Sequence, residues 1–181
     1  MKNKKLVICI ISIVAVLCVL FLILGAKGET KFALSELQVN GEFQYAKAAW
    51  GISVEEAEKS LSAELEWDKN RSVANGNTMF YYSKKTLLMD GHKANVSLEF
   101  ANDQLQLIQI SFRDSELEWY ENQIKILQEL YGQEKEKIES ALGSLLSQGY
   151  RWDTEKTSLQ VVHMRDAESS KGRMIISIGL K

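Results

Sequence analysis

The chain has 181 residues, of which 45% are hydrophobic and 25% are charged. Residues 1–31 hold five of the 22 basic residues and one of the 24 acidic ones, so residues 32–181 carry 17 basic and 23 acidic groups, a net of −6. That sign argues against a nucleic-acid partner. Both cysteines, Cys9 and Cys18, lie near the N-terminus. Residues 32–181 therefore contain no disulfide, Cys-ligated zinc or thiol nucleophile.

The N-terminal segment combines a basic start with a long apolar run. Lys2, Lys4 and Lys5 precede Leu6–Leu24, which holds no charged residue. A helix over this run would be about 28 Å long, close to the roughly 30 Å thickness of the hydrocarbon core. The lysines favour a cytoplasmic N-terminus. We expect a single-pass plasma-membrane protein with a cytoplasmic tail at 1–5, a transmembrane anchor at 6–26, a linker at 27–31 and an extracytoplasmic α+β domain at 32–181.

Two other roles are open to the same segment. A cleaved secretory signal could end near Ala26-Lys27-Gly28, but such signals usually have a shorter apolar region and an Ala-x-Ala site. A lipoprotein signal fits less well, because Leu17 before Cys18 is too bulky for a lipobox. We therefore favour an uncleaved anchor.

The first half of the domain predicts a hairpin, a helix and three strands. Asn40-Gly41 is a two-residue turn signal between Leu37–Val39 and Glu42–Tyr45. Ser53 and Glu56 form a capping box, which starts a helix over Val54–Leu65. The three strands are Met79–Leu88, Lys93–Phe100 and Gln104–Arg113, with a turn at Asp90-Gly91 and a β-bulge at Leu107-Ile108.

The second half repeats this order. Apolar residues at helical spacing run from Leu117 to Tyr131 and resume over Ile138–Leu145. Three further strands are expected at Tyr150–Thr154, Thr157–Met164 and Lys171–Leu180. The predicted fold class is α+β: an N-terminal transmembrane helix followed by one domain of two helix-plus-three-strand units, with an antiparallel sheet and the helices on one face.

A resemblance to known families is carried by Trp50-Gly51-Ile52-Ser53-Val54-Glu55-Glu56, by Leu61, and by Val96–Phe100 with Asn102-Asp103-Gln104-Leu105. This pattern resembles the small outer-membrane-assembly lipoproteins and is similar to the β-lactamase-inhibitor-protein fold. It covers residues 50–105, with 115–180 as a looser second copy. The chain departs from it at Glu66-Trp67-Asp68, where those families place Gly-x-Pro. The resemblance implies a fold and the binding of other proteins, and it carries over no functional residue.

The sequence offers little for catalysis. His92 follows a turn signal, and His163 shares strand parity with Leu159 and Val161, so both are expected to be structural. There is no His-Glu-x-x-His, EF-hand loop or Gly-x-Ser-x-Gly. We expect no enzyme activity, no metal and no cofactor.

The candidate binding residues lie on the polar face of the predicted sheet and among its aromatics. They are Glu99, Ser111, Arg113, Tyr82 and Trp152. The function expected is a membrane-anchored binding or assembly module that recognises another envelope protein through this face. One alternative is an inhibitor of an envelope hydrolase that uses the loop Arg71–Thr78 or Glu168–Gly172. Another is a sugar- or lipid-binding domain, which needs an apolar pocket between helix and sheet. Oligomeric state is left open.

Overall fold

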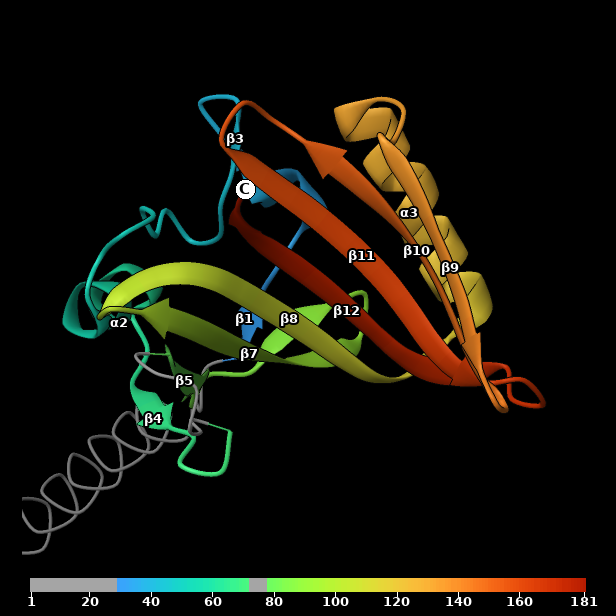
Figure 1. Ribbon diagram of the computed structural model, residues 1–181, viewed down its shortest axis with the longest axis horizontal. Helices are drawn as coiled ribbons and strands as arrows, with labels where there is room; N and C mark the ends of the chain where they lie inside the picture. The colour runs from blue at the N-terminus through green and yellow to red at the C-terminus, as the bar shows by residue number, and fades with distance from the viewer. Residues whose placement is uncertain (1–28, 72–77) are drawn as a thin grey trace, which may run out of the picture.

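The computed structural model describes residues 29–71 and 78–181 (Figure 1). The predicted tail and anchor lie outside these residues. Within them, no helix is both long and apolar enough to cross a bilayer. The elements are β1 Thr30–Lys31, the 3-10 helix η1 Leu34–Leu37, β2 Gln38–Val39, β3 Glu42–Phe43, α2 Val54–Leu61, β4 Leu65–Trp67, β5 Thr78–Ser83, β6 Leu87–Met89, β7 His92–Ala101, β8 Gln104–Glu116, α3 Leu117–Tyr131, β9 Glu136–Leu142, β10 Leu145–Asp153, β11 Thr157–Asp166 and β12 Lys171–Leu180.

One large mixed sheet dominates the described residues. Its strand order is β1-β6-β7-β8-β12-β11-β10-β9, with β5 also paired to β7 and β4 to β5. β1 pairs with β6 in parallel, and the other pairs are antiparallel. The last strand, β12, lies between β8 and β11 and so joins the two halves of the sheet (Figure 1).

The predicted arrangement of two helix-plus-three-strand units is wrong. The helical stripe expected over 138–145 is instead the edge strand β9 and the start of β10. The apolar residues there fit helical spacing, but they do not form a buried face, since Leu142 is 81% exposed. The predicted strand Met79–Leu88 is two strands, β5 and β6. The sheet is also mixed rather than wholly antiparallel.

Several local predictions are confirmed. The Asn40-Gly41 hairpin forms with both residues at positive φ, 53° and 82°. Ser53 and Glu56 make the capping box of α2. That helix ends earlier than predicted, because Ser62 adopts a left-handed conformation and Leu65 begins β4. A bulge is present in β8, but it lies at Gln106, one residue before the predicted position.

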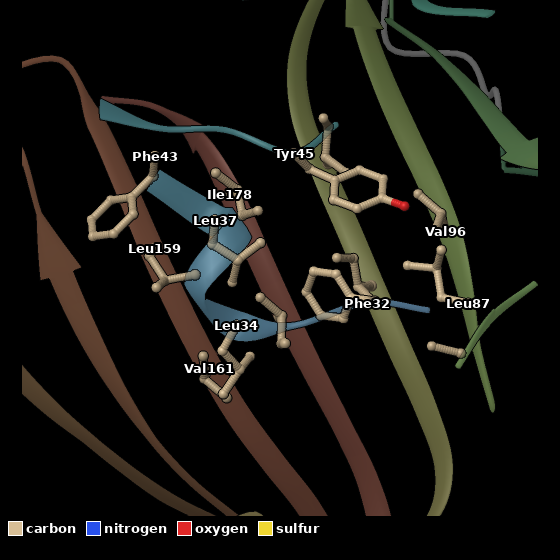
Figure 2. Close-up of a cluster of buried hydrophobic side chains, with 14 of the residues drawn as sticks. Phe32, Leu34, Leu37, Phe43, Tyr45, Leu87, Val96, Leu159, Val161 and Ile178 are labelled. Atoms are coloured by element: carbon tan, nitrogen blue, oxygen red, sulfur yellow. The ribbon is translucent and has the colours of Figure 1, made fainter. Parts of the chain in front are cut away.

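The core lies on one face of the sheet and is filled by the N-terminal segment of the domain. Figure 2 shows Phe32, Leu34, Leu37 and Phe43 against side chains of the sheet. Their partners include Val96, Leu159, Val161 and Ile178, all buried. Helix α3 contributes buried residues to the same face, among them Tyr120 and Leu127. Within the described residues, the opposite face of the sheet is left without a helix.

The carboxylate of Glu42 holds the N-terminal segment of the domain against the turn between β10 and β11. Glu42 accepts hydrogen bonds from the hydroxyls of Thr154 and Thr157 and from the backbone N–H of Lys156. The Phe43 amide donates to the Thr157 hydroxyl over 2.8 Å. These bonds, led by that from Thr154, lower the pKa of Glu42. Because Glu42 follows the Asn40-Gly41 turn, the hairpin positions this contact.

Candidate functional site

The uncovered face of the sheet, which we call the open face, carries the side chains that alternate with the core residues. Strand register aligns Tyr82, Ser97, Gln109, Ser177 and Gln160 in one row across β5, β7, β8, β12 and β11. The amide of Gln109 donates to the Ser177 hydroxyl over 3.3 Å. The open face is thus polar along its central row.

A concavity of about 310 Å³ lies on the open face. Its lining comes from strands β5, β7, β8 and β12 and from one residue between β4 and β5. The lining residues are Arg71, Tyr82, Asn95, Ser97, Gln109, Ser111, Arg113, Arg173 and Ile175. None of these nine residues is acidic, and three are arginines. We call this the arginine concavity. It offers guanidinium, hydroxyl and amide donors together with one aliphatic and one aromatic surface.

A β-bulge brings two of the arginines together. Gly172 pairs with Ser115 and Met174 pairs with Phe112, so Arg113 and Asp114 of β8 oppose the single residue Arg173 of β12. Asp114 takes a positive φ of 54° at this point. Bulges bend a strand and re-aim its side chains. Here the bulge places Arg113 and Arg173 across from each other on the open face.

The third arginine is held by neighbouring side chains. Arg71 donates from Nη2 to Gln109 Oε1 over 3.1 Å, and its guanidinium lies 4.4 Å from the centre of the Phe80 ring. Asp68 accepts from the Arg71 amide and from Tyr82. Burial alone would raise the pKa of Asp68, but these hydrogen bonds outweigh it and lower the pKa. Asp68 therefore orients two residues of the concavity's rim.

The structure brings together three of the five predicted binding residues. Tyr82, Ser111 and Arg113 line the arginine concavity. Glu99 lies on the open face outside it, paired with Phe80 and Leu107. Trp152 is not on this face.

The placement of Trp152 in the core follows from strand register. It pairs with Leu159, which lies on the core face, and only 3% of Trp152 is exposed. Its Nε1–H donates to the carbonyl of Gly132 over 2.9 Å, which satisfies the indole. The tryptophan is therefore a structural residue at the C-terminal end of α3.

Arg71 and Arg173 are among the six lining residues that were not predicted as binding residues. The alternation of β12 does place Arg173 on the polar side of its strand. The strand that lies beside Arg173 could not be predicted from the sequence. β12 pairs with β8, from the first half of the domain, as well as with β11, from the second half. Arg71 lies before β5, and no motif or residue spacing in the sequence marked it as a candidate.

The structure describes the two alternative sites only in part. The loop Arg71–Thr78 lies largely outside the described residues. The loop Glu168–Gly172 is tied to Arg165, whose Nη1 donates to the carbonyls of Asp166, Ala167 and Ser169. The groove between α3 and the strands β9 and β10 has a volume of about 370 Å³. Its lining includes charged residues from both sides, such as Lys125 and Glu139, rather than the apolar wall that a lipid needs.

A buried histidine lies on the core face beneath α3. His163 is fully buried, its ring stacks on Tyr120 with centroids 5.1 Å apart, and its Nε2 lies 3.0 Å from the Ser115 carbonyl. Among the described residues, its Nδ1 has no hydrogen-bond partner. The neutral imidazole fits this site, with Nε2 as the donor. Burial lowers the pKa of His163, and the charge of Arg165 acts in the same direction.

We predict that the free energy of unfolding falls as the pH drops below about 6.5, the ordinary pKa of histidine. The unfolded chain binds a proton there that the folded chain resists, so this contribution is complete above that pH and is lost as the pH falls through the lowered pKa. Urea unfolding between pH 7.5 and 5 measures it. His163→Phe, which keeps a ring against Tyr120, should flatten the dependence. An unchanged dependence in His163→Phe would contradict the prediction.

Comparison with known proteins gives a structural likeness but no family. No protein-family model matches the chain, and no curated protein matches it. Among solved structures, the chain is similar to the DUF4309 family protein YjgB from Bacillus subtilis subsp. subtilis strain 168, with 11% identity and a TM-score of 0.41. The match covers 78% of this chain and 88% of YjgB. A likeness at this level identifies neither a function nor a partner, and the resemblance to assembly lipoproteins stays a prediction.

Proposed function

We propose that the chain is a non-catalytic binding module that recognises another envelope protein through its open sheet face. In this proposal residues 6–26 anchor it in the plasma membrane, with the N-terminus in the cytoplasm and the domain outside. The observation that carries the proposal is the arginine concavity, a hollow on a sheet face that is left without a helix in the described part of the chain.

The chemistry of the lining favours binding over catalysis. The nine residues include Ser97 and Ser111, but none of the nine is a histidine, cysteine, aspartate or glutamate. A serine nucleophile needs an adjacent base to take its proton. At the rim, Tyr82 is 43% exposed and offers a rigid aromatic surface of the kind that dominates protein interfaces. The arginines would orient the partner as it approaches.

Site-specific photocrosslinking in native membranes tests the proposal. A benzophenone amino acid placed at Tyr82 keeps an aromatic ring at the rim, and we expect it to capture a discrete protein. The matched control is Asn122, an exposed residue of α3, which packs on the other face. Capture from both positions alike, or from neither, would count against recognition by the open face. Protease treatment of whole cells tests the topology, because an outside domain must be degraded.

A further inference from the structure

The distribution of arginines is uneven in an acidic domain. The chain has five arginines, and three of them line the arginine concavity. The other two have acceptors elsewhere: Arg151 is bonded to Asp153, and Arg165 to three backbone carbonyls. Within the described residues, Arg113 and Arg173 form no ion pair. Within the described residues, four arginines form no ion pair with a carboxylate, and three of these four line one hollow.

The convergence gathers three positive charges in one hollow of the free protein. Arg113 and Arg173 lie on opposite sides of the bulge and both line the concavity, and like charges close together on a sheet repel each other. Arg71 adds a third guanidinium to the same lining. An anion in the concavity would remove the repulsion and supply acceptors for the unused donors. The arrangement is thus suited to a negatively charged ligand.

We infer that the arginine concavity binds carboxylate side chains of an acidic segment of the partner protein. This inference rests on the proposed function and adds the chemistry of the partner. The planar fork of a guanidinium matches the two oxygens of a carboxylate. Tyr82 and Ile175 add aromatic and aliphatic surface beside the arginines, which suits a polypeptide better than a bare polyanion. A volume of about 310 Å³ is at the low end for ligand pockets, so the hollow takes a few side chains.

Fluorescence anisotropy with the full-length protein in detergent micelles tests the inference. The probe is a fluorescein-labelled peptide of ten glutamates, and a peptide of ten glutamines is its neutral counterpart. We expect the glutamate peptide to bind and the glutamine peptide not to. Arg113→Gln combined with Arg173→Gln should weaken binding at least tenfold. Arg113→Lys with Arg173→Lys should give an intermediate loss, because charge is kept and the fork is lost.

The matched control removes two positive charges elsewhere. Lys47→Gln with Lys125→Gln changes two exposed lysines outside the concavity and should alter binding by less than twofold. Equal weakening in both double variants would show non-specific attraction and overturn the inference. Unchanged binding in the arginine variant would overturn it as well, provided that its circular dichroism matches the parent.

A competition arm separates the two sources of negative charge. Inorganic polyphosphate of ten phosphates should displace the glutamate peptide less effectively than unlabelled glutamate peptide does. Stronger displacement by polyphosphate would assign the site to phosphate and overturn the inference for an acidic protein segment. If Tyr82 captures a partner while the glutamate peptide fails to bind, the proposed function stands and this inference falls.

Discussion

Trp152→Ala is expected to lower the free energy of unfolding by about 3–5 kcal/mol, the usual range for removing a large aromatic side chain from a core. Only 3% of Trp152 is exposed, and its indole N–H satisfies the carbonyl of Gly132. Truncation would leave both a cavity and an unpaired carbonyl at the end of α3. Denaturant unfolding followed by far-ultraviolet circular dichroism measures the change, since that signal does not depend on the tryptophan removed.

Tyr82→Ala is the matched control for this prediction. Both aromatics were candidate binding residues, but Tyr82 is on the open face and 43% exposed. We expect its replacement to change stability by less than about 1 kcal/mol while weakening partner recognition. The reverse pattern, with a stable Trp152→Ala that no longer recognises the partner, would place Trp152 at the interface and contradict the structure.

Gly172→Ala is expected to destabilise the fold by about 3 kcal/mol, at the upper end for overpacking. A Cβ on Gly172 would lie 2.2 Å from the Met164 carbonyl oxygen and 3.0 Å from Cε1 of the buried His163. Because a backbone oxygen cannot move aside as a flexible side chain can, β12 would have to shift against β11. Arg173 is the next residue, so glutamate-peptide binding should weaken together with stability.

Gly143→Ala in the β9–β10 turn separates packing from backbone conformation. No atom of the described part of the chain lies within 4 Å of its added Cβ, but Gly143 has a positive φ of 61°. The cost should therefore be only that of a left-handed non-glycine residue, about 1 kcal/mol. Comparing the two denaturation midpoints tests this order. A larger loss in Gly143→Ala than in Gly172→Ala would show that the sheet relaxes around Gly172.

Sequence patterns predicted strands and turns correctly where residues close together in the chain decide the conformation. Val96, Leu98 and Phe100 alternate with polar residues, and all three lie on the core face. Asp90-Gly91 adopts the positive φ angles that its dipeptide favours. The apolar spacing that begins at Ile138 predicted a helix wrongly, because the same spacing also occurs by chance in a short exposed strand. In that segment pairing with β10 decides the conformation, and no local signal records it.

The candidate site was predictable only in part for a related reason. Ser111 and Arg113 belong to a strand whose alternation is plain, so their face could be read from sequence. Arg173 lies 60 positions after Arg113 in the chain and reaches it only because β12 inserts next to β8. The bulge between them is a property of two strands at once. The alternation of side chains within one strand predicts neither the pairing of β12 with β8 nor the bulge.

The N-terminal segment also sets how the domain would bear tension. β1 pairs with β6 over only two residues, and the chain then enters the core through Phe32, Leu34 and Leu37. A pull at residue 29, opposed by a load on the open face, would first break this short parallel contact. It would then have to extract three apolar side chains one after another. Under load, unfolding should therefore begin at the N-terminal end of the domain, before the long pairing of β8 with β12 is strained.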